Sequence, residues 1–298
     1  MQPNPVLQKL GFSKDDRVVI IHTDDIGMCQ ASVDAFADLQ EFGLISSGAV
    51  MVPCPWFLEA AAYSRQHLQA DLGVHLTLTS EWKTYRWRPL STTDLKSGLI
   101  DEEGYFYHLA EQVQEHGDPE AVRCEIEAQV SRALAAGMQP THVDTHMGAV
   151  ATPQFIPAYV QLASLYRLPP MIFRLDEAGW QAETGMDPDT AALAAQLVVQ
   201  LEATGLPLLD HIVGLSLEDP ADRLGQARQA FDGLKPGLTH FIIHPAKDTP
   251  ELRAITPDWR CRVADYETFL KEELRRSIKE MGIQVIGYRV IKALMESA

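Results

Sequence analysis

Short runs of β-branched and other apolar residues alternate along the chain with longer stretches in which an apolar residue recurs every three or four positions. The short runs predict buried strands, and the longer stretches predict amphipathic helices. The predicted strands lie at residues 17–22, 46–52, 71–78, 141–145, 171–175, 211–215, 238–244 and 283–288. The predicted helices lie at residues 31–42, 56–68, 118–137, 154–167, 188–205, 219–234 and 266–282. The pattern therefore predicts seven or eight βα units.

Two α/β architectures suit this alternation, a (β/α) barrel and an open doubly wound sheet. A glycine-rich GxGxxG sequence does not follow the first predicted strand, which weakens the case for a dinucleotide-binding sheet. The composition does not change abruptly anywhere, so we expect residues 1–298 to form a single domain. The aromatic segment 80–108 is too long for an ordinary connection, and it predicts a lid or substrate loop.

Charge and composition narrow the range of partners. The formal net charge of −16 argues against nucleic acid and against an anionic membrane surface. Apolar runs stay far below the roughly 18 residues that a membrane span requires, and the first residues lack the pattern of a signal peptide, so we expect a cytoplasmic protein. The four cysteines are scattered without a CxxC pair, which predicts buried free thiols. A homodimer is the expected assembly.

Ionisable residues stand at the ends of at least five predicted strands. They are His22, Asp24 and Asp25 after the first strand, His75 in the third, His142, Asp144 and His146 in and after the fourth, Arg174 in the fifth, and His244 in the seventh. In α/β barrels the active site is built at the carboxyl ends of several strands. This placement predicts that the side chains meet at one rim of the barrel.

Each of these residues also has a simpler explanation when it is taken alone. Asp24 or Asp25 could cap the helix that follows, and His75 could be a hydrogen-bonded core histidine. Asp144 could orient a neighbouring imidazole, and the sequence HPAKD after the seventh strand could be only a turn. These explanations require several independent coincidences, whereas one metal site accounts for all the placements.

The chemistry that fits these residue types is metal-assisted hydrolysis. One carboxylate and two imidazoles give a divalent ion three protein ligands and leave positions for water and substrate. A second carboxylate can accept a proton from the attacking water, and a histidine can protonate the leaving amine. Zinc, magnesium, nickel and cobalt all suit such a ligand set, with zinc and magnesium expected ahead of the other two.

Four motifs, HTDDIG, GVHLTLT, THVDTHMG and IIHPA, together resemble the YdjC/ChbG-like carbohydrate deacetylases in order and approximate spacing. The resemblance covers residues 17 to 288. It implies a distorted TIM-like (β/α) barrel that removes acetyl groups from N-acetylated sugars such as chitooligosaccharides. It also implies one divalent ion, held by an aspartate and two histidines.

The resemblance assigns roles motif by motif. The implied metal ligands are Asp25, His75 and His146. Asp24 is the implied general base, and His244 is the implied general acid or a substrate contact. Arg174 is expected to orient Asp24. Asp144 and His142 are expected to support the metal ligands from behind.

Two departures from the family pattern concern the expected pocket. Family members usually continue the fourth motif with further histidines, whereas Met147 and no later histidine follow His146 here. His22 stands where an asparagine is common, and we expect it to supply a polar group to the pocket wall. These changes affect the expected substrate more than the metal site.

The aromatic residues of the lid suggest how a sugar could be held. Trp82, Tyr85 and Trp87 could stack on sugar rings, or they could only pack the lid against the barrel. Arg86 and Arg88 lie among them, so an anionic substituent such as a phosphate is a further option.

Three other protein classes share part of this pattern. A phosphatase with an aspartyl nucleophile has a DxD spacing, which the sequence DDIG lacks. A TIM-barrel amidohydrolase places an HxH pair on its first strand, and that pair is absent here. A catalytically silent metal- or sugar-binding barrel would lose the base or the acid, whereas Asp24 and His244 are both present. Hydrolysis of another amide, ester or phosphorylated small molecule remains an alternative.

Overall fold

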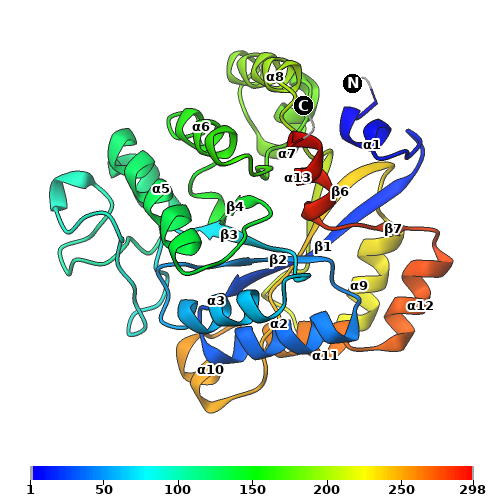
Figure 1. The fold of residues 1–298 in the computed structure, drawn as a ribbon, viewed down its shortest axis with the longest axis horizontal. Coiled ribbons are helices and arrows are strands. Elements are labelled where there is room, and N and C mark those ends of the chain that lie inside the picture. Colours follow the sequence, from blue (N-terminus) through cyan, green and yellow to red (C-terminus); the bar gives the residue numbers. More distant parts are fainter. Residues whose placement is uncertain (1–2, 297–298) are drawn as a thin grey trace.

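The computed structural model describes residues 3–296, apart from the side chains of residues 183 and 184. Its strands all run parallel in one curled sheet, in the order β4-β3-β2-β1-β6-β5, with β7 also paired to β1. The strands are β1 Arg17–Ile26, β2 Ser47–Val50, β3 Leu72–Leu76, β4 Val143–Thr145, β5 His211–Gly214, β6 Gly237–Ile243 and β7 Gln284–Val285. Helices surround this sheet (Figure 1).

The predicted strand at 171–175 is replaced by an extended segment that makes only isolated bridges. Val143 of β4 pairs with Pro170, and Phe173 pairs with Leu209, two residues before β5. Pro170 has no backbone N–H to donate, which limits continuous pairing along this segment. The segment nevertheless links the two edges of the sheet, so the predicted distorted (β/α) barrel is confirmed, with a seam between β4 and β5.

Helices follow most of the strands, largely where the apolar periodicity predicts them. The helices are α1 Pro5–Lys9, α2 Gln30–Phe42, α3 Phe57–Gln66, α4 Ala110–His116, α5 Pro119–Ala135, α6 Ile156–Tyr166, α7 Glu177–Thr184, α8 Pro188–Ala203, α9 Arg223–Asp232, α10 Pro250–Ile255, α11 Trp259–Phe269, α12 Glu272–Glu280 and α13 Tyr288–Glu296. The single helix predicted at 266–282 is divided between α11 and α12, because Lys271 adopts an extended conformation. The strand predicted at 283–288 is short, since α13 begins at Tyr288.

The predicted lid segment, 80–108, is largely irregular in the structure. It contains one short 3₁₀ turn, η1 Leu95–Ser97, and one isolated bridge between Ile100 and Phe106. Trp87 is buried in this segment, and its indole Nε1–H donates to the Thr79 carbonyl oxygen at 2.8 Å. The segment is therefore anchored to the barrel by its own side chains.

Gly98 lets the lid pass close to α4, and we expect alanine there to be destabilising. A Cβ at Gly98 would lie 1.8 Å from the His116 carbonyl oxygen, whereas a Cβ at Gly104 would meet nothing within 4 Å. Both glycines have a positive φ, so Gly104→Ala controls for backbone strain. We predict that Gly98→Ala lowers the free energy of unfolding by about 1–2 kcal/mol more than Gly104→Ala does. Urea unfolding measures the difference, and equal losses would contradict the close approach.

Two further expectations concern cysteines and membranes. All four cysteines are free, and Cys29, Cys54 and Cys261 are buried as predicted, whereas Cys124 on α5 is exposed and corrects the expectation that all four are buried. Among residues 3–296, none of the helices combines the length and apolar character that crossing a bilayer requires.

Candidate functional site

An irregularity in β1 brings two adjacent carboxylates to one site. The register against β2 passes from Thr23 opposite Gly48 to Ile26 opposite Val50, so β1 has one extra residue there. Asp25 has a φ of 61°, a conformation that aspartate tolerates better than most residues. Neighbours on a regular strand point to opposite faces, and this bulge removes that constraint.

The alternative that an aspartate caps α2 is wrong. The N-cap residue of α2 is Cys29, and its side chain makes no capping hydrogen bond. Asp24 and Asp25 instead lie inside β1, where both are almost fully buried. Buried carboxylates require partners of opposite charge or a metal ion, so their surroundings define the site.

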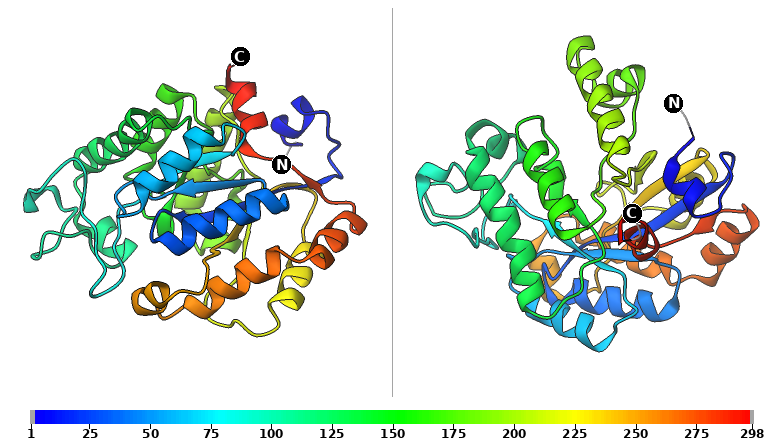
Figure 2. Two further views of the ribbon diagram at one scale, coloured as in Figure 1. Left: turned by 60° about the horizontal axis from the view of Figure 1, so that its bottom comes forward. Right: turned by 45° about the horizontal axis from the view of Figure 1, so that its top comes forward.

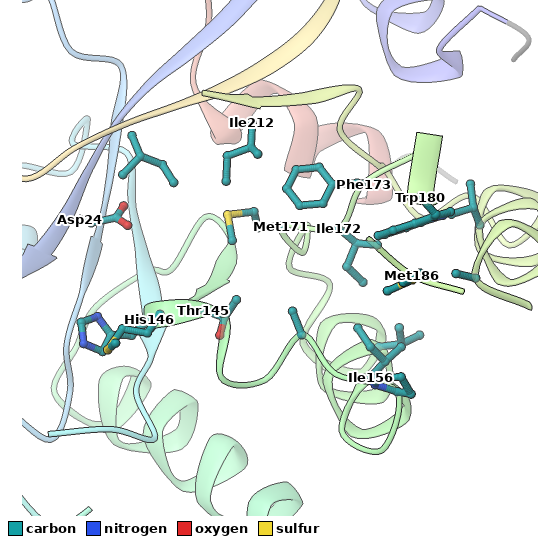
Figure 3. A pocket seen from close by; sticks show the side chains of 18 of the residues that line it. Asp24, Thr145, His146, Ile156, Met171, Ile172, Phe173, Trp180, Met186 and Ile212 are labelled. Carbon is teal, nitrogen blue, oxygen red and sulfur yellow. The ribbon is translucent and has the colours of Figure 1, made fainter. Parts of the chain in front are cut away.

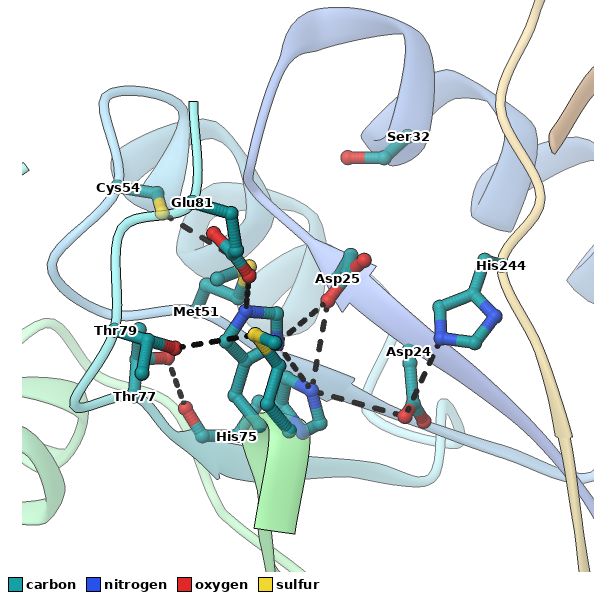
Figure 4. Close-up of polar contacts among 12 residues, drawn as sticks. Asp24, Asp25, Ser32, Met51, Cys54, His75, Thr77, Thr79, Glu81 and His244 are labelled. Carbon is teal, nitrogen blue, oxygen red and sulfur yellow. Dashed lines mark hydrogen bonds and ion pairs between the residues drawn. The ribbon is translucent and has the colours of Figure 1, made fainter. Parts of the chain in front are cut away.

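Three donor atoms from three strand ends converge beside the bulge. Figure 4 labels two of the residues that carry them, Asp25 and His75. Asp25 Oδ1 lies 3.1 Å from His146 Nδ1 and 3.5 Å from His75 Nε2. The two imidazole nitrogens lie 3.2 Å apart. Two donors of a tetrahedral zinc ion, each at about 2.0–2.1 Å from it, are separated by about 3.3–3.4 Å. The three atoms therefore have the spacing of a ligand set.

One buried oxygen at this position also lacks a hydrogen bond. Asp25 is only 2% exposed, and within the part of the chain that the structure describes its Oδ1 atom has no hydrogen-bond partner. A buried carboxylate oxygen without a donor is costly, and a cation would satisfy it. These residues therefore fit a divalent ion.

The outer nitrogens of both histidines are held by carboxylates. His75 Nδ1 lies 2.8 Å from Asp144 Oδ1, and His146 Nε2 contacts Glu81 Oε1. A carboxylate behind an imidazole selects the tautomer that leaves the other nitrogen's lone pair free for a metal. Asp144 thus lies where the sequence predicted support for the ligands, whereas Glu81 was not predicted.

His22 lies behind Asp24 and not in the pocket wall, so that expectation is wrong. His22 is fully buried, with Nδ1 at 2.7 Å from Asp24 Oδ1 and Nε2 at 2.8 Å from His142 Nε2. His142 in turn stacks on the Tyr288 ring, with ring centroids 3.9 Å apart. His22 and His142 therefore form a buried support behind Asp24.

The charges at the site keep both aspartates ionised. Burial on its own would raise the pKa of Asp24, but the positive charge of His75 and the hydrogen bond from His22 hold that pKa well below its usual range. Burial opposes ionisation of Asp25 too, but the guanidinium of Arg262 and the imidazoles of His146 and His75 together outweigh it and hold the pKa of Asp25 well below its usual range. Both carboxylates are therefore ionised at neutral pH, and each can bind a cation or accept a hydrogen bond from water.

The pKa of the His146 imidazole is shifted upward, in contrast to the lowered pKa values of the two aspartates. Burial on its own lowers the pKa of His146, but the carboxylates of Glu81 and Asp25 raise it to about 9. An ion that binds to this imidazole must displace its proton, so occupancy of the site is coupled to proton release.

A guanidinium reaches the acidic pair, but it belongs to Arg262 and not to Arg174. Arg262 Nη1 donates to Asp25 Oδ2 at 2.7 Å, and Arg262 Nε donates to Asp258. Asp258, Arg262 and Asp265 are spaced i, i+4 and i+7 around the start of α11, and this spacing was the available sequence signal. Such a charged face of a helix usually points to solvent, which is why it was missed.

The expected position of Arg174 is corrected by the structure. Arg174 Nη1 donates to Asp210 Oδ1 at 2.7 Å, and Arg174 Nε contacts Glu202. Asp210 directly precedes β5 and also accepts from the Leu238 amide early in β6. Arg174 therefore lies toward the amino ends of these strands, whereas Asp24 lies near the carboxyl end of β1, because the segment 170–173 is offset along the barrel.

His244 follows β6 and faces the acidic pair from the other side (Figure 4). Its Nε2 lies 3.9 Å from Asp24 Oδ2, and its backbone N–H donates to Asp265 Oδ2 at 2.9 Å. Asp265 is also paired with Arg223, so the position of His244 is fixed by a buried ion pair. His244 can reach a group bound beside Asp24.

Of the three lid aromatics, one lines the cavity, where a sugar could stack on it, and two pack the lid against the barrel. Trp82 lines the cavity over the site, with the Arg262 guanidinium 5.9 Å from its ring. Trp87 is buried and the Tyr85 hydroxyl donates to the Met28 carbonyl oxygen, so these two pack the lid and do not line the cavity. Arg86 is paired with Asp101, which removes it as an anion-binding candidate.

The donor atoms open into a cavity of about 1010 Å³. Asp24, Asp25, His146 and His244 line one end of it. Carboxylates, imidazoles and a substrate-sized space therefore occur together, as metal-dependent hydrolysis requires.

Most of the chain is similar to known proteins. A family model described as YdjC-like protein matches residues 18–280. A carbohydrate deacetylase of Thermus thermophilus is 37% identical over 275 residues, which are 92% of this chain and 94% of that protein. A carbohydrate deacetylase of Geobacillus stearothermophilus is 31% identical over 275 residues, 92% of this chain and 97% of that protein.

One solved structure has a similar fold. A protein of Enterococcus faecalis V583, named for cellobiose-phosphate cleavage, matches with a TM-score of 0.76 and 23% identity. The match covers 93% of this chain and 99% of that chain. It supports the barrel assignment.

Proposed function

This chain belongs to the family of YdjC-like proteins, and on that premise we propose that it is a metal-dependent hydrolase that removes an acetyl group from N-acetylated sugars. Two relatives that match over nearly their whole length are named carbohydrate deacetylases. The observation that carries the proposal is the convergence of Asp25 Oδ1, His75 Nε2 and His146 Nδ1 at the cavity end.

In this proposal Asp25, His75 and His146 hold the divalent ion. The ion supplies Lewis acidity, which polarises the acetamide carbonyl and lowers the pKa of water. Zinc and magnesium come first as candidates, with nickel and cobalt as further options. Arg262 fixes the Asp25 carboxylate through its second oxygen, and Asp144 fixes the ring of His75.

Asp24 and His244 are proposed to handle the protons. Asp24 accepts a proton from the water as the water oxygen bonds to the carbonyl carbon. The C–N bond then breaks, and His244 donates a proton to the leaving nitrogen, which gives acetate and a free amine. The two side chains are close enough to act on one substrate, since His244 Nε2 lies 3.9 Å from Asp24 Oδ2.

The test is acetate release from N,N′-diacetylchitobiose and from N-acetylglucosamine after loading with each of the four metals. We expect release from at least one sugar, loss of release with a chelator, and recovery when metal is restored. An N-acetylated amino acid serves as the comparison amide. If no loaded form releases acetate from either sugar or from any N-acetylglucosaminide, the sugar deacetylase proposal is wrong.

Asp144→Asn is expected to weaken metal binding without removing a ligand. The amide cannot accept the His75 N–H as strongly as the carboxylate, which sits 2.8 Å away. Replacing such a partner typically lowers metal affinity by about 10–100-fold. Competition with a chelator measures the affinity, and Asp15→Asn, at an exposed position, is the control. Equal affinity of both variants and wild type would show that Asp144 does not act through His75.

A further inference from the structure

Most of the cavity beyond the polar end is apolar. Figure 3 shows Asp24 and His146 at one end, Met171, Ile172 and Phe173 along the middle, and Trp180 and Met186 at the far end. Helix α8 contributes further apolar side chains, Leu193, Ala194, Leu197, Val198 and Leu201, with Thr190 as its polar member. At about 1010 Å³ the cavity reaches the upper end of the roughly 300–1,000 Å³ typical of small-molecule sites. A sugar ring beside Asp24 would leave this wall unfilled.

Several of these apolar side chains are open to solvent. Leu193 is 67% exposed, Ile212 is 44% exposed and Leu197 is 36% exposed, although all three line the cavity. Helix α8 packs mainly against α7, and the pair projects from the barrel (Figure 2). Apolar surface left in water at the mouth of a site favours an apolar occupant.

The position of the wall indicates which part of the substrate it contacts. Ile242 of β6 and Ile212 of β5 form the wall next to His244. The opposite side of the ligand set is closed by Glu81 and Trp82 of the lid. His244 is the proposed donor to the leaving nitrogen, so the amine half of the substrate, and not the acetyl half, lies toward the apolar wall.

We infer that the substrate is an amphiphile, in which the N-acetylated sugar carries a long apolar chain or ring system on its aglycone side. This inference rests on the proposed function and specifies its substrate class. The sugar lies between Asp24, His244 and Arg262, and the apolar group extends along residues 171–173 to α8. The wall is continuous with the candidate metal centre, so one molecule fills both.

The test compares octyl and methyl glycosides of N-acetylglucosamine, kept below the micelle threshold of the octyl compound. We expect kcat/KM for acetate release to be at least about tenfold higher for the octyl glycoside, mainly through KM, because its methylenes leave water. Leu197→Gln is expected to reduce this octyl-to-methyl ratio several-fold. Gln196→Ala, on the neighbouring exposed position of α8, is expected to keep the ratio.

A binding experiment distinguishes failure of this inference from failure of the proposed function. Titration of the metal-loaded Asp24→Asn variant with both glycosides is expected to give at least about a tenfold lower Kd for the octyl compound. Acetate release from both glycosides at equal kcat/KM, with equal Kd values, would overturn the inference and leave the deacetylase proposal standing. Tighter octyl binding without acetate release from any sugar would support the apolar site and overturn the deacetylase.

A second copy of the chain is the competing occupant of the α8 face. Sedimentation of wild type and Leu197→Gln measures this directly. A wild-type dimer that Leu197→Gln converts to monomer, together with equal Kd values for both glycosides, would assign the face to an interface and overturn the inference. An oligomeric state that Leu197→Gln does not change supports the substrate wall.

Discussion

Replacing His146 by alanine is expected to abolish metal binding and acetate release together. His146 Nδ1 is one of three donor atoms that lie 3.1–3.5 Å from one another. Removing it leaves two protein ligands, and the loss of affinity should exceed the roughly 100-fold that follows removal of an outer partner. Activity should fall by about 10³-fold or more, since the ion is worth several kcal/mol of transition-state stabilisation.

Metal content by mass spectrometry and acetate release are the two measurements for His146→Ala. His116→Ala is the matched control, because His116 ends α4 at the surface, away from the ligand set. We expect the control to retain one ion per chain and full activity. If His146→Ala also retains one ion per chain at the wild-type affinity, the ligand assignment is wrong.

Asp24→Asn is expected to retain the metal and lose catalysis. The amide has the shape of the carboxylate but cannot accept the water's proton, and loss of a general base typically lowers kcat by about 10²–10⁴-fold. The prediction discriminates between roles, because Asp24 Oδ2 lies 3.7 Å from His75 Nε2, almost as near as Asp25 Oδ1 at 3.5 Å.

Asp25→Asn is the natural partner variant for this experiment. It changes the neighbouring carboxylate in the same bulge, and we expect it to lose the metal as well as activity. The two variants therefore have opposite expected metal contents. Loss of metal from Asp24→Asn with retention in Asp25→Asn would exchange the two roles. Full kcat for Asp24→Asn would exclude it as the base.

The strand ends were predictable because hydrophobic runs locate parallel strands and a barrel collects their carboxyl ends at one rim. His75, His146 and Asp25 come together for this reason. The arrangement of the acidic pair was not predictable in the same way. It depends on one extra residue in β1 and on a positive φ at Asp25, and two adjacent aspartates in a sequence specify neither feature.

The errors at Arg174 and Arg262 have a second physical cause. The order of residues along the chain does not give their position along the barrel. Arg174 ends an apolar run, but that run pairs beside the start of β5 and carries Arg174 away from Asp24. Arg262 comes from a helix far along the chain and reaches Asp25 across the rim. Helical periodicity shows that α8 has an apolar face, but it does not show whether protein or a cavity covers that face.

The seam between β4 and β5 separates the strands that carry the candidate metal ligands from the segment that forms most of the apolar wall. The proposed chemistry uses residues in or just after β1, β3, β4 and β6, where continuous pairing between β1 and β6 and between β3 and β4 holds the donor atoms in place. Most of the apolar wall comes from residues 171–173 and from α7 and α8, which are inserted where the sheet has only isolated bridges, and Ile212 and Ile242 of β5 and β6 complete it. We therefore expect substitutions in that insertion to change the proposed substrate range while Asp25, His75 and His146 keep their geometry.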